Sequence, residues 1–162
     1  MATDKTPEVE HEVPLNTSDD ITQDGRPIFK TKHYDMIPVK EKRGAIRILR
    51  LHPGDPREPE VRCELIPGTI LTKEEQMQDG TEKDGLLFKP YDALSWCWGR
   101  DPQSARISIL KDETSYVKYV QPNLLAALRA LRHETYARYL WVDAICINQD
   151  FKAEKNVSLM IN

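Results

Sequence analysis

The sequence predicts an α/β fold: a mainly parallel sheet with flanking helices and an N-terminal β-hairpin. The first observation is a near-continuous apolar run from Tyr139 to Gln149, typical of a strand covered on both faces. The second is the order of patterns from residue 91 onward, which run strand, hairpin, helix, strand and helix. The third is a pair of β-rich runs, 46–51 and 61–66, separated by turn residues that favour a hairpin.

Composition and charge exclude several classes of function. The chain of 162 residues is 40% hydrophobic and 30% charged, and its net charge of −3 resides in the first 30 residues, which carry −4. The remainder lies near +1 without a basic stripe, so nucleic acid is not an expected partner. An apolar run of the ~20 residues that a membrane helix needs is absent, as is the core of a signal peptide. We therefore predict a cytoplasmic protein without a membrane span.

The cysteines indicate neither a disulfide framework nor a metal site. Cys63, Cys97 and Cys146 are odd in number and far apart, which is typical of reduced thiols. The sequence contains no Cys-x-x-Cys or His-Glu-x-x-His spacing, so no metal is predicted.

We divide the chain into three parts. Residues 1–33 are polar, acidic and poor in aromatic residues, so we expect a disordered tail that adds nothing to the core. Residues 34–88 are expected to form the lead-in β-hairpin and a charged loop. Residues 89–162 are expected to form the α/β domain.

Within the third part, periodicity predicts the individual elements. A strand is expected at 91–99, and a hairpin at 107–120 whose strands flank a polar turn. Pro122 to His133 is predicted as a helix, since it opens with proline and carries leucines at i, i+4 and i+7. The run 139–149 supplies the central strand, and a last helix is expected at 153–161.

The first candidate site lies at residues 143–154. Asp143 interrupts an apolar run, and a carboxylate there is costly unless partners satisfy it. Asn148 and Gln149 follow where the predicted strand ends, and ligands of α/β sheets collect at the carboxyl ends of strands. The alternative is that Asp143 accepts backbone N–H bonds while Asn148 and Gln149 form a cap and turn. Ser95 is a further pocket candidate, or a small residue that lets a helix pack closely.

Three sequence blocks stand together in a recognisable order. They are Tyr-Asp-Ala-Leu-Ser-Trp-Cys-Trp-Gly at 91–99, Asn-Leu-Leu-Ala-Ala-Leu-Arg-Ala-Leu-Arg at 123–132, and Leu-Trp-Val-Asp-Ala-Ile-Cys-Ile-Asn-Gln-Asp at 140–150 followed by Glu-Lys. In this order and spacing the chain resembles the heterokaryon incompatibility (HET) domain of filamentous fungi, from about Arg47 to Met160. The resemblance implies a role in programmed cell death after fusion of incompatible cells. It also implies a distant likeness to TIR domains and hence a partial flavodoxin-like sheet.

The resemblance departs from the family pattern at the end of the chain. The pattern normally continues beyond the Glu-Lys helix into further strands and helices, whereas this sequence stops at Asn162. The sequence is therefore interpreted as a truncated HET domain, either a fragment or a shortened relative.

The TIR likeness also implies a chemistry. Many TIR domains cleave the nicotinamide bond of NAD with a glutamate on the helix after a central strand, and the matching position is Glu154. A fixed carboxylate stabilises the oxocarbenium-like state of such a cleavage, and Trp98 is a candidate for stacking on a ring of NAD. NAD would then be a substrate, with no bound cofactor. The alternative is that Glu154 only decorates a helix N-terminus.

A non-enzymatic function is the competing hypothesis. The chain would then be a self-association or interaction module that assembles with other protein domains of a signalling complex, or an inactive truncated relative.

Overall fold

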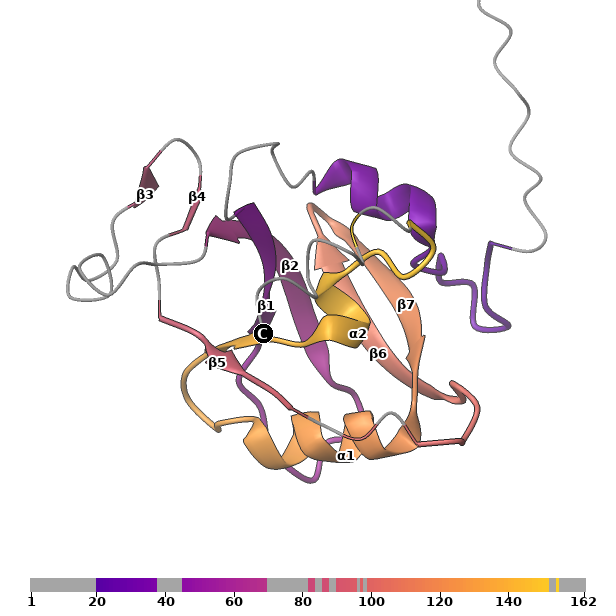
Figure 1. Ribbon diagram of the computed structural model, residues 1–162. Coiled ribbons are helices and arrows are strands. Elements are labelled where there is room, and N and C mark those ends of the chain that lie inside the picture. Colours follow the sequence, from indigo (N-terminus) through magenta and orange to yellow (C-terminus); the bar gives the residue numbers. More distant parts are fainter. Residues whose placement is uncertain are drawn as a thin grey trace, which may run out of the picture.

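A mixed eight-stranded sheet with helices packed on it confirms the predicted α/β class (Figure 1). The computed structural model describes residues 20–37, 45–69, 82–83, 86–87, 90–95, 97, 99–151 and 154. The strands are β1 (Ala45–Leu51), β2 (Arg62–Thr69), β3 (Glu82–Lys83), β4 (Leu86–Leu87), β5 (Asp92–Ala93), β6 (Ala105–Lys111), β7 (Thr114–Val120) and β8 (Arg138–Trp141). The helices are the 3₁₀ helix η1 (Thr31–Met36), α1 (Pro122–Leu131) and α2 (Asp143–Cys146).

The sheet combines parallel and antiparallel pairs. Its strand order is β3-β4-β2-β1-β8-β5, and β6 also pairs with β2 and continues the sheet to β7. The pairs β2–β4, β2–β6 and β5–β8 are parallel, whereas β1–β2, β1–β8, β3–β4 and β6–β7 are antiparallel. Because β1 bonds both to β2 and to β8, the lead-in hairpin and the predicted α/β domain share one sheet.

Both predicted hairpins are confirmed. β1 pairs with β2 from Ala45↔Thr69 to Leu51↔Cys63, and β6 pairs with β7 across a tight turn. In that turn Asp112 adopts φ 52°, a left-handed conformation that aspartate tolerates better than most residues.

Helix α1 also forms where its sequence predicts. Pro122 opens it, and Leu124 and Leu128 are buried on the side that packs against β6. The helix ends at Leu131 rather than His133, because Arg132 has an extended backbone.

The strand predicted at 139–149 is wrong beyond Trp141. β8 ends there, and the Cys146 N–H donates to the Val142 carbonyl at 2.7 Å in the turn of α2. The apolar run misled the prediction because a short buried helix and a short buried strand have the same composition. The strand that is covered on both faces is instead β1, in which Ile46, Arg47, Ile48 and Leu49 are consecutively buried.

The strand predicted at 91–99 is also shorter than expected. β5 spans Asp92–Ala93 and pairs with the end of β8, extended by a bond from the Leu94 N–H to the Trp141 carbonyl at 2.9 Å. Farther on, the Asn123 side chain donates to the Cys97 carbonyl, so the chain turns toward the start of α1 instead of continuing the strand. The helix predicted at 153–161 lies outside the described residues except for Glu154.

An ordered segment replaces much of the predicted tail. Residues 20–37, here called the N-terminal strap, contain η1 and pair with β7 through an Ile28↔Val117 bridge. Phe29 and Tyr34 are buried in the core cluster. The expectation of a disordered 1–33 tail is therefore wrong for residues 20–33, since two aromatic side chains spaced five apart suffice to dock a short, polar segment. Residues 1–19 lie outside the described part of the chain.

Phe29 provides a test of the strap's contribution to stability. Phe29→Ala should lower the free energy of unfolding by about 3 kcal/mol, because a buried aromatic ring leaves a cavity. Ile21→Ala, in the same strap but 49% exposed, should change it by less than about 0.5 kcal/mol. Urea unfolding of both variants measures the difference, and equal effects would contradict docking of the strap.

Candidate functional site

Glu154 is anchored by a buried arginine, Arg47, that lies 107 positions earlier in the chain. Its Oε1 accepts a charge-assisted hydrogen bond from Nη1 of Arg47, and the side chains are 20% and 5% exposed respectively. The same oxygen accepts the Asn148 N–H at 3.1 Å. The carboxylate therefore joins β1 to the loop after α2 and satisfies a donor of that loop.

Arg47 distributes its remaining donors over three other backbone positions. Nε donates to the Ile37 carbonyl at 2.7 Å, Nη1 to the Cys146 carbonyl at 3.2 Å, and Nη2 lies 3.5 Å from the Tyr34 carbonyl. The guanidinium also lies 4.9 Å from the centre of the Tyr34 ring. A buried charge is tolerated when it is paired and hydrogen-bonded, and each nitrogen of the Arg47 guanidinium has at least one acceptor.

Tyr34 adds a second link between the strap and the site. Its hydroxyl donates to the Ile145 carbonyl at 2.8 Å, at the buried side of α2. Burial raises the pKa of this phenol well above its ordinary value, so the hydroxyl keeps its proton. The strap, β1 and the loop after α2 are thus joined by hydrogen bonds at one place.

Three predicted site residues form the turn that leads to Glu154. The Asp143 carboxylate accepts the Ala144 N–H at 2.7 Å, and the Gln149 amide donates to the Asp143 carbonyl at 2.8 Å. Asn148 is buried, and its side-chain oxygen accepts the Asp150 N–H at 3.3 Å. These contacts match the cap-and-turn alternative of the sequence analysis.

Ser95 and Trp98 are the other two predicted site residues. Ser95 is exposed just after β5, and Asp143 follows β8, so both follow the carboxyl ends of a parallel pair. Trp98 lies outside the described residues. The structure thus brings Asp143, Asn148, Gln149 and Glu154 together and leaves Ser95 at the exposed edge.

The buried thiols are poor nucleophiles. Burial raises the pKa of Cys146 to about 12 and raises that of Cys63 well above its ordinary value. Because the thiolate is the reactive form, both groups are inert at neutral pH.

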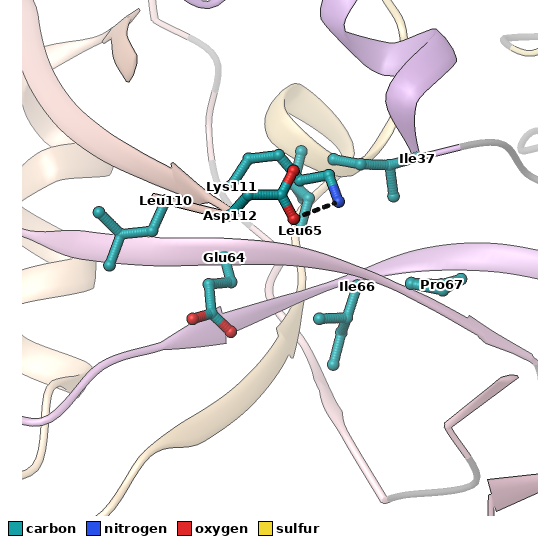
Figure 2. A pocket seen from close by; sticks show the side chains of 8 residues that line it. All are labelled: Ile37, Glu64, Leu65, Ile66, Pro67, Leu110, Lys111 and Asp112. Carbon is teal, nitrogen blue, oxygen red and sulfur yellow. Dashed lines mark hydrogen bonds and ion pairs between the residues drawn. The ribbon is translucent and has the colours of Figure 1, made fainter. Parts of the chain in front are cut away.

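A small cavity lies away from Glu154, where β2 runs past the end of β6 (Figure 2). Its volume is about 300 Å³, at the lower end of the range for small-molecule sites. It is lined by Ile37, Glu64, Leu65, Ile66, Pro67, Leu110, Lys111 and Asp112. No predicted site residue lines this cavity, although Ile37 also accepts the hydrogen bond from Arg47.

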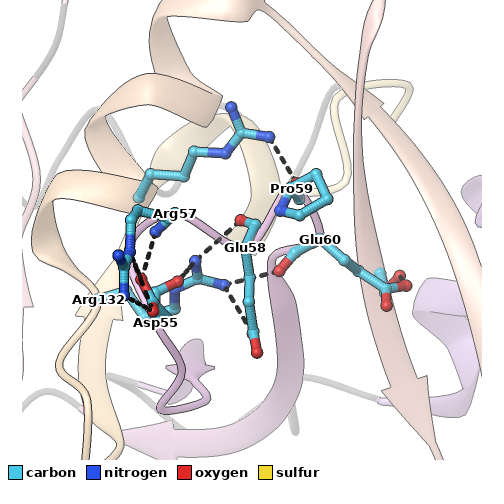
Figure 3. Close-up of polar contacts among 8 residues, drawn as sticks. Asp55, Arg57, Glu58, Pro59, Glu60 and Arg132 are labelled. Atoms are coloured by element: carbon cyan, nitrogen blue, oxygen red, sulfur yellow. Dashed lines mark hydrogen bonds and ion pairs between the residues drawn. The ribbon is translucent and has the colours of Figure 1, made fainter.

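Arg132 organises a second polar cluster at the end of α1 (Figure 3). Its guanidinium donates to the carbonyls of Glu60 at 2.7 Å and Glu58 at 3.0 Å, and also to that of Asp55. All three belong to the β1–β2 connection, so the cluster fixes that loop to the helix. Gly54 fits this approach, because a Cβ there would lie 2.9 Å from the Glu58 carboxylate. Nη1 of Arg132 also lies 3.9 Å from the Glu58 carboxylate, but the hydrogen-bond acceptors of Arg132 are backbone carbonyls, so the cluster has a structural role.

The described residues contain neither a metal-binding cluster nor a membrane-spanning helix. No group of three or more histidine, cysteine, aspartate or glutamate side chains among them is arranged to hold a metal ion. None of the helices in the described part of the chain has the length and apolarity needed to cross a bilayer.

Arg47 and Tyr34 are not among the site residues predicted from the sequence. In the sequence, Arg47 is only one of the charged residues interleaved in a β-rich run. Alternation along β1 contained the signal, because Arg47 shares a face with Leu49 and Leu51, which are both buried. Tyr34 gave no comparable signal, since it stands in a polar segment.

Comparison with known proteins agrees with the motif analysis. Residues 91–161 match the family model described as heterokaryon incompatibility protein (HET). A curated relative from Neurospora crassa, heterokaryon incompatibility protein 6, OR allele, is 26% identical over 137 residues. That alignment covers 79% of this chain and 18% of the relative, so the chain spans less than a fifth of the relative's length. No solved structure matches the chain.

Removing Arg47 tests whether it supports the site. Arg47→Met should lower the free energy of unfolding by about 3 kcal/mol, since it leaves a largely buried carboxylate without its partner. Arg50→Met is the matched control on the same strand: Arg50 pairs with Glu64 but its side chain is 41% exposed. It should cost less than about 1 kcal/mol. Chemical denaturation compares them, and similar losses would show that Arg47 has no special role.

The buried amine of Lys118 should make the stability of the fold depend on pH. Its amine lies 5.3 Å from the centre of the Tyr34 ring and 5.6 Å from that of Phe29, and burial lowers its pKa to about 8. Because the unfolded lysine keeps its proton up to about pH 10.4, folding becomes more favourable as pH rises from about 8 to 10.4.

Unfolding of the wild type and Lys118→Met across this range isolates the effect. The wild type should gain on the order of 2 kcal/mol relative to the variant between pH 7 and 10.5. Parallel stability profiles would contradict the burial of the amine.

Proposed function

We propose that the chain acts in self/non-self recognition as a signalling module, because residues 91–161 match the heterokaryon incompatibility (HET) family model. Programmed cell death is the proposed outcome of that signal. The proposed mode of action is self-association, together with binding to other protein domains of a signalling assembly. The name of the Neurospora crassa relative supports the same role.

The observation that supports a non-enzymatic function is that the Glu154 carboxylate already has hydrogen-bond partners within the chain. Its Oε1 receives both Arg47 and the Asn148 N–H, so the carboxylate already neutralises a buried cation. A carboxylate held in this way stabilises a cationic transition state less, because the guanidinium offsets its charge. In the proposed role, Glu154 fixes the loop as part of a protein-binding surface.

NAD hydrolysis is the second candidate. It is favoured by the setting of Glu154, a partly buried carboxylate that accepts the Asn148 N–H of the segment following β8 and α2. Ligands of α/β sheets collect beyond the carboxyl ends of parallel strands, and β8 is parallel to β5. For this candidate, Glu154 would face the oxocarbenium-like centre while Arg47 holds it in place.

A cell-based experiment tests the proposed role. The gene product that contains this chain is expressed in a filamentous fungus, and cell death is scored after fusion with an incompatible strain. Glu154→Gln should retain the response, because the amide oxygen still accepts from Arg47 and Asn148, whereas Arg47→Met should abolish it.

An NAD assay in parallel decides between the candidates. The signalling module predicts no release of nicotinamide by the purified protein, with or without Glu154→Gln. If nicotinamide appears and Glu154→Gln reduces its rate by about 100-fold or more at an unchanged unfolding midpoint, NAD hydrolysis replaces the module.

A further inference from the structure

The N-terminal strap is docked at one edge of the sheet. The Phe29 N–H donates to the Val117 carbonyl at 2.7 Å, and the Val117 N–H donates to the Pro27 carbonyl at 2.8 Å. In Figure 1, η1 lies beside the segment that follows α2. The strap therefore covers part of the outer edge of β7 and reaches the loop that contains Glu154.

Thr31 bridges these two segments at the surface. It is the first residue of η1 and is exposed, and its hydroxyl donates to the Asp150 carboxylate in the loop after α2. A surface hydroxyl is thus the donor in a contact between residues that are 119 positions apart.

The charged residues around Thr31 come from both segments. Lys30 and Lys32 flank it, and both amines pair with Asp20, whose pKa they lower to about 2. These three residues all belong to the strap. Asp150, which faces the hydroxyl directly, belongs to the other segment.

We propose that Thr31 is a phosphorylation site whose modification releases the strap from the loop after α2. A protein kinase that selects basic flanking residues would supply the reaction, with ATP as the phosphoryl donor. The Thr31 oxygen forms a bond to the γ-phosphorus, the bond from that phosphorus to the β–γ bridging oxygen breaks, and ADP leaves. The hydroxyl proton passes to the base of the kinase.

The direction of the effect follows from the arrangement of charge. The phosphate carries about −1.5 to −2 at pH 7, so it repels Asp150 and removes the donor of the present hydrogen bond. Lys30 and Lys32 attract the phosphate equally well in the docked and the released strap, since they move with Thr31. Repulsion thus acts only on the docked state.

Among the residues that the structure describes, Lys118 is the cation that opposes release. It lies on β7 beneath Phe29 and Tyr34, and Asp150 is close enough to raise its pKa against the larger effect of burial. Its amine is covered by the two rings, whereas Asp150 contacts Thr31 directly. Repulsion by Asp150 therefore outweighs attraction by Lys118.

Amide hydrogen exchange on the full chain with phosphothreonine installed at position 31 is the direct test. The amide of Phe29 should exchange on the order of tenfold faster. This factor is what Coulomb repulsion gives when a phosphate charge of about −2 lies about 5 Å from the Asp150 carboxylate in water. Amides between β1 and β2 should exchange at an unchanged rate. Thr31→Glu should act in the same direction with a smaller effect. Thr135→Glu, an exposed threonine away from the strap, should leave Phe29 exchange unchanged.

A second substitution separates repulsion from loss of the hydroxyl. Asp150→Asn should restore Phe29 protection in the phosphorylated chain, whereas Thr31→Val should accelerate exchange less than phosphothreonine does. Unchanged protection with phosphothreonine, or failure of Asp150→Asn to restore it, would overturn the proposal.

Mass spectrometry tests the modification itself. The chain is incubated with Mg·ATP and the catalytic domain of a kinase that selects lysine on both sides of threonine. Phosphate should appear on Thr31, and its absence there would refute the assignment. Neither test measures cell death or NAD cleavage, so the result is independent of the proposed function.

Discussion

The buried guanidinium of Arg47 is the interaction on which the described structure most depends. Placing a cation inside a sheet costs several kcal/mol of hydration, and the cost is offset only if every donor finds an acceptor. The acceptors come from η1 and the residue after it, from the end of α2, and from Glu154. One side chain of β1 thereby fixes three segments that are distant in sequence.

This constraint explains why the loop after α2 is ordered without regular structure. A four-residue helix has little stability of its own, because almost all of its carbonyls lack partners within the helix. Arg47 and the Tyr34 hydroxyl supply partners to the carbonyls of Cys146 and Ile145. The loop is therefore held by groups outside it, and its geometry follows the position of β1.

The sequence predicted those parts of the fold that depend on local pattern. The two hairpins and α1 have alternating or helical periodicity together with turn residues, and they form as expected. The division between β8 and α2 was not predictable in this way, because Ile145 and Cys146 would be buried in either conformation. The prediction for the strap was wrong for another reason. Phe29 is buried because the strap pairs with β7, and composition alone does not reveal that pairing.

The candidate site shows the same limit. The sequence identified Asp143, Asn148, Gln149 and Glu154 as a polar group, and the structure brings them together in one turn. It did not identify Arg47, because a charged side chain in a β-rich run is ordinarily assigned to the exposed face of the strand, although Arg47 shares its face with the buried Leu49 and Leu51.

The family match begins at residue 91, yet the partners of Glu154 do not all lie within it. Arg47 stands 107 positions before Glu154, and the strap that shares this arginine stands earlier still. A segment that began at residue 91 would keep Glu154 and the Asn148 turn but lose the cation that holds them. β8 would also lose β1, its antiparallel neighbour, and keep only the two-residue strand β5 beside it. The structural unit that supports the candidate site therefore includes β1, β2 and the strap, and any role of Glu154 is a property of that larger unit.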